Sequence, residues 1–252
     1  MKVRPGMEAA GLTDVGCHRE NNEDNYVYWE PQDDAAFQRL GRLAVVADGM
    51  GGAEGGQHAS RIAVEAVSQM YPGSPEADPQ QRLLESFREA NHRVQQEARA
   101  KPMLHGMGTT LTACAIVGNS LYFASIGDSR LFLIRDGEAR QLSRDHSLVA
   151  RLIESGTIRP EDAETHPQKH VLTAAIGVAE DLQPDMPSAP IELRSSDVLI
   201  LCTDGLWGQM TPAEIAEIAS KSAPKNACKS LVQLAKDRGG PDNITVQVLR
   251  VA

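Results

Sequence analysis

Four aspartates in this chain each stand at one end of a short apolar run of the kind that forms a buried strand, and this placement restricts how the chain can fold. Three follow their runs and one precedes its run: residues 43–47 come before Asp48, 121–126 before Asp128, 198–203 before Asp204, and 244–249 after Asp242. A carboxylate at the rim of a buried sheet is held rigidly while its oxygens stay open to solvent. Several such rims that meet at one place make a site for hard cations, which prefer oxygen ligands.

Composition narrows the class of protein. The 252 residues are enough for one large domain with a buried core, and we expect a single domain over residues 1–252. A formal net charge of -9 and a pI near 5.3 repel phosphate polymers on average. This excludes a general binder of nucleic acid or of an anionic membrane surface.

The N-terminal residues, the length of the apolar runs and the cysteines together indicate a cytoplasmic protein. Residues 1–8 contain no apolar stretch of signal-peptide length, and the apolar runs elsewhere fall far short of a membrane span. We therefore expect a cytoplasmic protein that does not associate with a membrane. The widely spaced cysteines indicate neither a disulfide framework nor a zinc site; they are Cys17, Cys114, Cys202 and Cys228.

The spacing of apolar residues predicts strands and helices in separate blocks. Strands are predicted near residues 43–47, 110–142, 191–203 and 244–251, and helices over 59–70, 80–100 and from an N-cap at Thr211. Residues 109–142 favour three strands in an antiparallel meander. Helices inserted between blocks of antiparallel strands are typical of the α+β class, here a sandwich of sheets flanked by helices. Residues 145–190 begin with a short capped helix and are then broken by prolines, which predicts a surface flap.

The Asp-Gly dipeptide by itself is a strong hairpin signal, and the chain contains a control for it. Asp136 and Gly137 lie between two strand-like runs and are predicted to form a plain turn. Asp48 and Gly49 differ, because five of the eight residues 49–56 are glycine and a helix follows instead of a returning strand. So much glycine permits a ligand to approach the backbone closely, which favours a functional loop over a flexible connection.

The other aspartates also have ordinary interpretations. Asp204 fits an Asx turn before a buried Trp207, Asp242 fits a turn before the last strand, and Asp128 fits an ion pair with Arg130. Four acidic turns at the ends of buried runs, with no lysine placed in sequence to neutralise them, require positive charge from elsewhere.

Taken in order, the motifs around these aspartates resemble those of the metal-dependent protein phosphatases of the PPM (type 2C) family. The set covers nearly the whole chain and consists of Arg19 with residues 22–24, 48–52, 108–110, 127–130, 145–147, 204–206 and 242–245. The resemblance implies a four-layer α-β-β-α sandwich of two antiparallel sheets flanked by helices, with the flap near residues 145–190. It also implies a protein serine/threonine phosphatase, similar to the bacterial stand-alone members that oppose Ser/Thr protein kinases.

Carried over by position, the resemblance implies a metal site and a clamp for the substrate phosphate. The implied metal ligands are Glu23, Asp24, Asp48, Gly49, Asp128, Asp204 and Asp242, and the implied clamp is Arg19. In this scheme Asp48 bridges two essential ions, Asp204 and Asp242 complete the first of them, and Glu23 with Asp24 holds the waters of the second. Asp128, together with Asp204, holds a third and weaker ion. The catalytic set is then Arg19, Asp48, Asp204 and Asp242.

The chemistry of these residue types agrees with those roles. Every implied ligand is an oxygen, which suits Mn²⁺ or Mg²⁺ and not zinc. Two such ions roughly 3.5–4 Å apart activate a shared water for in-line attack on a phosphoester. A planar guanidinium such as that of Arg19 offers a phosphate two parallel hydrogen bonds, which lysine does not.

The chain departs from the family pattern at three positions. Some members have a histidine just after the Asp-Gly pair, where this chain has Met50 and Ala53, and an arginine is common in the flap where it has Ala174. His58 and His146 remain nearby in sequence, although a lone histidine is more often structural.

Two alternatives stay open beside the leading hypothesis of a phosphatase for phosphorylated proteins in a cognate Ser/Thr kinase pathway. One is a hydrolase of small phosphate esters that uses the same site. The other is a pseudophosphatase that binds phosphoproteins without cleaving them. For each we expect a monomer.

Overall fold

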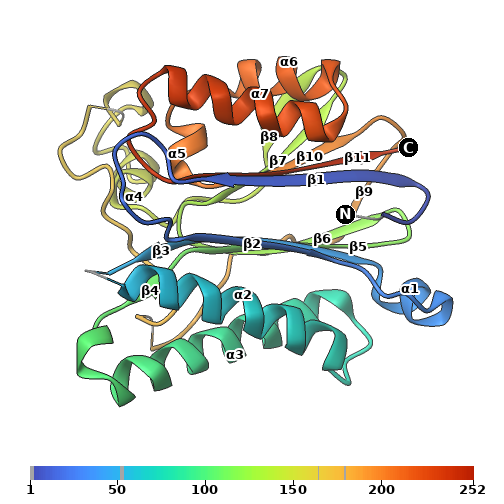
Figure 1. Cartoon of the computed structure of the whole chain (residues 1–252), viewed down its shortest axis with the longest axis horizontal. Helices are drawn as coiled ribbons and strands as arrows, with labels where there is room; N and C mark the ends of the chain where they lie inside the picture. The colour runs from blue at the N-terminus through green and yellow to red at the C-terminus, as the bar shows by residue number, and fades with distance from the viewer. Residues whose placement is uncertain (1–2, 52–53, 164, 179) are drawn as a thin grey trace.

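Two antiparallel sheets face each other in the computed structural model, which describes residues 3–51, 54–163, 165–178 and 180–252 (Figure 1). One sheet has the order β1 (Met7–Asp14), β11 (Ile244–Val251), β10 (Val198–Cys202), β7 (Arg130–Arg135) and β8 (Glu138–Gln141). The other has the order β2 (Asp24–Trp29), β3 (Arg42–Met50), β5 (Leu111–Val117), β6 (Ser120–Ile126) and β9 (Ile191–Glu192), and the short β4 (Gly108–Thr109) pairs with β3.

A pair of long helices covers the outer face of each sheet (Figure 1). Helices α2 (Gly55–Gly73) and α3 (Pro79–Ala100) lie on the β2–β9 sheet, whereas α6 (Pro212–Lys221) and α7 (Pro224–Asp237) lie on the β1–β8 sheet. The shorter helices are α1 (Asp34–Leu40), α4 (Leu148–Glu154) and α5 (Asp204–Trp207), with 3₁₀ turns at Pro102–Leu104 and Pro160–Asp162. The implied four-layer sandwich is therefore confirmed. In the described part of the chain no helix combines the length and the apolar character needed to cross a membrane.

Alternation of side chains along the strands explains why the layers stack in this way. On β3, Leu43 and Val45 face α2 and α3, whereas Ala44 and Val46 face the opposite sheet. The buried side chains of the other central strands divide in the same manner. Three apolar clusters result, one beneath each helical layer and one between the sheets.

The space between the sheets becomes polar toward one end. Along β11 the inward side chains change from Leu249 to Gln247 and then Thr245. Gln247 is fully buried, and its Nε2 donates to the carbonyl oxygen of Val45 on the opposite sheet at 2.7 Å. The strand-end aspartates of the sequence lie at this polar end.

The predicted meander over residues 109–142 is wrong. Strands β5 and β6 form a hairpin in one sheet, and β7 and β8 form a second hairpin in the other sheet. Between them Gly127 has a φ of 97°, and a Cβ there would lie 2.6 Å from the side chain of Thr110. Turn signals identify hairpins, but they do not say which of two apolar sheet faces each hairpin joins. The plain turn predicted at Asp136 and Gly137 is confirmed, because both have positive φ.

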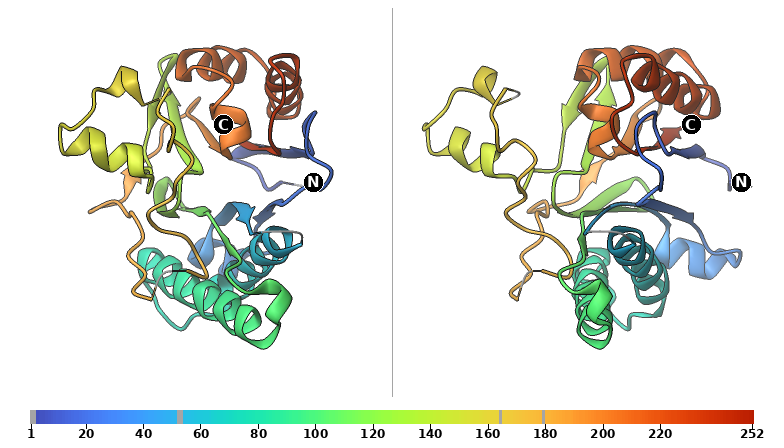
Figure 2. Two further views of the ribbon diagram at one scale, coloured as in Figure 1. Left: turned by 90° about the vertical axis from the view of Figure 1, so that its left-hand side faces the viewer. Right: turned by 60° about the vertical axis from the view of Figure 1, so that its left-hand side comes forward.

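The flap lies between β8 and β9 and contains α4 (Figure 2). The cap predicted at the start of this segment is Ser147, whose Oγ accepts from the backbone N–H of Ala150 at 3.2 Å. The α4 half stands away from the sandwich in Figure 2. The returning half is bound to the sheet edge, since Ile176 bridges to Thr109 and Asp185 to Ser125.

Replacement of Gln247 by Leu is expected to lower the free energy of unfolding by about 1–3 kcal/mol, because the buried bond to Val45 is lost and a buried carbonyl keeps one partner fewer. Urea unfolding measures this change. The matched control is Gln233→Leu on the exposed face of α7, expected to change stability by less than about 0.5 kcal/mol. Equal effects of the two substitutions would contradict a role for Gln247 in joining the sheets.

Candidate metal centre and phosphate site

A cleft opens at the polar end of the sandwich, and most of the predicted site residues line it. They come from both sheets and from the loops between them: Arg19, Glu23, Asp48, Gly49, Asp128, Asp204 and Asp242. The remaining predicted residue, Asp24, is buried next to them, and its Oδ2 accepts from Thr203 Oγ1 at 2.8 Å. The structure thus brings all eight residues to one place.

Asp48 points into the cleft because of its register on β3. It shares the inner face of the strand with Ala44 and Val46, and its partner on the neighbouring strand β2 is Asp24. The strand continues to Met50, beyond the predicted end at residue 47, because Gly49 and Met50 pair with β4. Both aspartates therefore project into the space between the sheets from fixed positions on paired strands.

Glycines in the loop after Asp48 allow three segments to meet. A Cβ on Gly49 would lie 2.1 Å from the carbonyl oxygen of Gly56, and a Cβ on Gly56 would lie 2.6 Å from Glu23 Oε2. The carboxylate of Glu23 consequently rests on the first turn of α2, where the helix dipole favours negative charge. Gly52 and Ala53, which the sequence singled out in this loop, lie outside the described residues.

A second close approach positions Asp204 and Asp242. Asp204 is the first residue of α5, and a Cβ on the following Gly205 would lie 2.0 Å from the carbonyl oxygen of Asn243. Asn243 Oδ1 accepts from the N–H of Glu23 at 2.8 Å, and its Nδ2 donates to the carbonyls of Val15 and Asn21. Asn243 thus ties the loop of Asp242 to that of Glu23. The sequence marked Asn243 only as part of a motif.

Asp128 lies in the turn between β6 and β7, where the chain crosses from one sheet to the other. Its side chain is buried, and its carbonyl oxygen accepts from Trp207 Nε1 at 2.9 Å. The alternative interpretation of an Asp128–Arg130 ion pair is wrong, because Arg130 pairs with Asp145. The turn thus leaves the Asp128 carboxylate directed at the cleft.

Arg19 lies at the rim and contacts one of the acidic residues. Its Nη2 donates to Asp242 Oδ2 at 2.7 Å, and about half of its side chain is exposed. The hydrogen bond to Asp242 raises the pKa of Arg19 further above its ordinary value. The guanidinium therefore stays charged at the mouth of the cleft.

The histidine that reaches the cleft was not identified from the sequence. His170, on the flap, lines the cleft with its Nδ1 3.9 Å from Asp204 Oδ2. His146 is instead structural, since its Nδ1 accepts from the N–H of Gly127 at 3.2 Å. His58 lies in the first turns of α2, away from the residues that line the cleft. No sequence signal places a histidine from a flap against a residue on a distant helix.

Crowding of carboxylates raises their pKa values. Burial raises the pKa of Asp24 to about 7, in spite of hydrogen bonds from two threonine hydroxyls that lower it. Burial, followed by the charge of Asp204, also raises the pKa of Asp128 to about 7. For Asp48, burial and then the charges of Asp24 and Asp204 hold the pKa well above its ordinary range. Protons or cations must balance this cluster.

The cluster fits a hard divalent cation by its chemistry. Asp24 Oδ1 and Asp204 Oδ1 are buried oxygens without a hydrogen-bond partner among the described residues. A bare buried carboxylate oxygen is costly, and an ion would satisfy it. All the donors are oxygens, which suits Mn²⁺ or Mg²⁺.

The side chains are not yet arranged as a closed coordination shell. In the described ranges no group of three His, Cys, Asp or Glu residues is tight enough to hold one ion as it stands. Asp242 is held by Arg19, and Asp204 lies beside His170. Asp204 already lies within hydrogen-bond reach of the Asp48 side chain, whereas Asp242 would have to leave Arg19 to serve an ion.

Comparison with known proteins defines the family. The sequence matches protein phosphatase 2C over residues 22–236. It is 38% identical over 249 residues to the protein phosphatase PhpP of Streptococcus pneumoniae, which covers 96% of this chain and 97% of that protein. The serine/threonine phosphatase structure from S. agalactiae has a TM-score of 0.87 and 34% identity, covering 98% of this chain and 100% of that one. The PstP catalytic domain, solved with 2 manganese ions, has a TM-score of 0.84 and 33% identity, covering 98% of each chain.

The family match covers most of the chain, and the structural match to a solved phosphatase covers nearly all of it. The chain belongs to the protein phosphatase 2C family.

Replacement of Gly56 by Ala is expected to weaken Mn²⁺ binding about tenfold, because the new Cβ displaces the Glu23 carboxylate. Isothermal titration calorimetry measures the affinity. The control is Gly73→Ala at the other end of the same helix, where a Cβ would meet nothing within 4 Å. Unchanged affinity in Gly56→Ala would show that Glu23 takes no part in ion binding.

Replacement of Asp128 by Asn is expected to stabilise the metal-free protein increasingly as the pH rises. A carboxyl with a raised folded pKa keeps its proton in the folded state after the unfolded chain has lost it, so its contribution to stability falls between its ordinary pKa and about 7. Asparagine imitates the protonated group and has no such loss. Urea unfolding in EDTA should give a stability difference that grows by about 1–3 kcal/mol between pH values of about 5 and 8. A difference that is constant with pH would contradict the raised pKa.

Proposed function

We propose that this chain is a metal-dependent protein serine/threonine phosphatase, which hydrolyses phosphoserine and phosphothreonine in proteins. The observation that carries the proposal is the convergence of carboxylates from both sheets on one cleft, with Arg19 at its rim. The family membership supports the same activity, since the similar PhpP and PstP proteins are named as phosphatases.

The proposed division of roles follows from where each side chain lies. Asp48 would bridge two ions from the centre of the cleft, Asp204 and Asp242 would complete one of them, and Glu23 with Asp24 would serve the other through waters. Bound ions of this kind supply Lewis acidity and lower the pKa of water, so that it attacks the phosphoester. We propose Mn²⁺ or Mg²⁺ for the pair and a weaker third site at Asp128.

The proposed task of Arg19 is to bind the phosphate of the substrate. Its guanidinium is charged and half exposed, and it offers two parallel donors to phosphate oxygens. Asp242 competes for the same donors in the present arrangement. A ligand role for Asp242 would release Arg19 to the substrate, since an oxygen that faces a cation no longer attracts the guanidinium as strongly.

We further propose one catalytic domain over residues 1–252, a cytoplasmic location, a monomeric state and a signalling role opposite a cognate Ser/Thr kinase. The balance of charge and the absence of a basic run support protein substrates over nucleic acid. The presence of all the proposed carboxylate ligands favours a catalytic protein over a pseudophosphatase, because a protein that only binds phosphoproteins would not need metal ligands.

Asp48→Asn and Asp204→Asn are each expected to lower the Mn²⁺-dependent hydrolysis of p-nitrophenyl phosphate by about a hundredfold or more, because each removes a charged metal ligand. EDTA should abolish the wild-type rate. The control is Asp136→Asn, an Asp-Gly pair in a plain hairpin turn whose positive φ asparagine also tolerates. A wild-type protein that stays inert with Mn²⁺ would contradict the proposed activity. Faster turnover of metabolite phosphates than of phosphopeptides would favour the small-ester hydrolase instead.

A further inference from the structure

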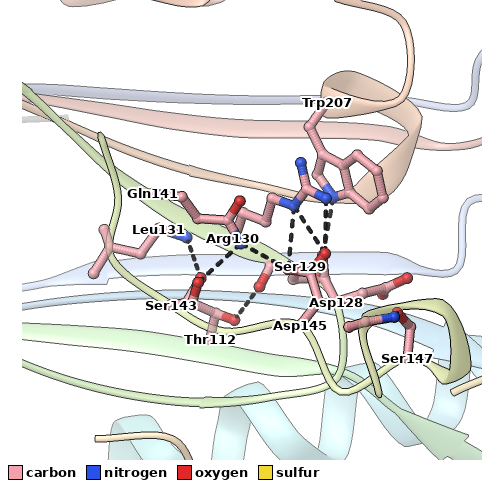
Figure 3. A network of polar contacts seen from close by, with 11 residues as sticks. Thr112, Asp128, Ser129, Arg130, Leu131, Gln141, Ser143, Asp145, Ser147 and Trp207 are labelled. Atoms are coloured by element: carbon pink, nitrogen blue, oxygen red, sulfur yellow. Dashed lines mark hydrogen bonds and ion pairs between the residues drawn. The ribbon is translucent and has the colours of Figure 1, made fainter. Parts of the chain in front are cut away.

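Arg130, the first residue of β7, follows the turn of Asp128 and contacts two segments that line the cleft but belong to different parts of the chain (Figure 3). These are the one-turn helix α5 that begins with Asp204, and the start of the flap at Asp145. The roles proposed above leave Arg130 without a function. Its contacts nevertheless lie between a proposed metal ligand and the flap.

The first contact is a two-pronged ion pair with the flap. Arg130 Nη2 donates to Asp145 Oδ2 at 2.7 Å, and its Nε lies 3.2 Å from both carboxylate oxygens. Gln141 Nε2 donates to Asp145 Oδ1 at 2.7 Å, so the carboxylate is held from a second side. Both partners are largely buried, with 19% and 14% of their side chains exposed. A pair of this kind is more specific in its geometry than a surface ion pair.

The second contact is a stack on α5. The guanidinium carbon of Arg130 lies 3.5 Å from the centre of the Trp207 ring, and Figure 3 shows the two groups face to face. The same indole donates its Nε1 to the carbonyl oxygen of Asp128 at 2.9 Å. Arg130 thereby fixes the ring that holds the backbone of the Asp128 turn.

The backbone of the flap is joined to the same turn. The N–H of His146 donates to the carbonyl of Gly127 at 2.8 Å, and the N–H of Thr173 donates to the carbonyl of His146 at 2.8 Å. Leu148 N–H donates to Val171 O at 2.8 Å. Both ends of the projecting half of the flap therefore converge beside Asp145, where Arg130 binds.

We propose that Arg130 is a positioning residue that locks the base of the flap and the Asp128 turn into one fixed arrangement beside the cleft. Its effect on the reaction rests on the proposed function, whereas its effect on the flap does not. The lock needs arginine, because a lysine supplies one point charge and neither the flat stacking face nor the second parallel donor. Through the flap, this lock would affect how the enzyme binds the residues that flank the phosphorylated side chain of a protein substrate. It would not affect the binding of the phosphate itself.

Amide hydrogen exchange of the metal-free chain tests the lock directly. In Arg130→Lys we expect the amides of His146, Leu148 and Thr173 to exchange about tenfold faster than in the wild type. Asp145→Asn keeps the shape of the partner and should give the same result. The double variant should be no worse than the more affected single variant, since both changes break one interaction. If Arg130→Lys fails to fold, Asp145→Asn alone decides the outcome by the same three amides.

The same strand provides the control. Arg135, at the far end of β7, forms a two-pronged pair with Asp197 through bonds of 2.9 and 2.6 Å, away from the residues that line the cleft; 26% and 2% of the two side chains are exposed. Arg135→Lys should leave the exchange of the three flap amides unchanged. Flap amides that respond alike to both lysine variants, or to neither, would overturn the proposal.

Kinetics separate positioning from a general loss of folded protein. In Arg130→Lys we expect kcat/KM for a phosphopeptide to fall about tenfold more than kcat/KM for p-nitrophenyl phosphate, which is too small to reach from the cleft to the projecting half of the flap. Loss of folded protein would lower both by the same factor, and such a result would overturn the kinetic part of the proposal. A wild type inactive on both substrates with Mn²⁺ would refute the proposed function, while the exchange experiment would still judge the lock.

Discussion

Mutual repulsion of carboxylates in a partly dry cleft is the constraint on which the rest of the site depends. Asp24 and Asp48 face each other on paired strands, and Asp128, Asp204 and Asp242 approach from the second sheet and its loops. Burial and like charge together favour protonated forms, so the folded chain is under electrostatic strain unless protons or cations neutralise the carboxylates. The Thr203 hydroxyl, the backbone N–H of Asn243 and the Arg19 guanidinium donate to these carboxylates and so limit this strain.

The same constraint explains why the site lies between two sheets. A single sheet would place its carboxylates in a row along one edge, with the spacing of adjacent strands. Two facing sheets can direct carboxylates at the same position from opposite sides. Because the inner faces are apolar over most of their length, the polar groups lie together at one end. The glycines at positions 16, 56 and 205 then allow the connecting loops to come close enough to complete the enclosure, because a Cβ at each would collide with a neighbouring segment. The site is therefore complete only where the two sheets and these loops are packed together.

Local patterns in the sequence predicted many of the elements and the four strand-end aspartates, but they did not predict β1, α1 or α7, nor the partners of the side chains. Apolar spacing predicted α3 to within a residue, and the glycines described in the sequence after Asp48 lie where other segments approach the backbone closely. The meander failed because sheet membership depends on which inner face a hairpin covers, a relation between distant segments. For the same reason the sequence did not find His170 beside Asp204, and it suggested Arg130 as a partner for its near neighbour Asp128 when the partner is Asp145. Sequence separation is a poor guide where the chain crosses between sheets.

The arrangement of the flap separates the requirements of chemistry from those of recognition. Its base is fixed by backbone bonds to Gly127 and by the Arg130 pair, and its returning half is bridged to β4 and β6. The part around α4 projects from the sandwich, and no side chain of α4 itself, Leu148–Glu154, is buried. Substitutions there change the surface offered to a protein substrate at little cost in core packing. Substitutions at the base would instead disturb the turn that carries Asp128, because the same hydrogen bonds hold both. A chain built in this way can vary its partners while the carboxylate cluster remains constant.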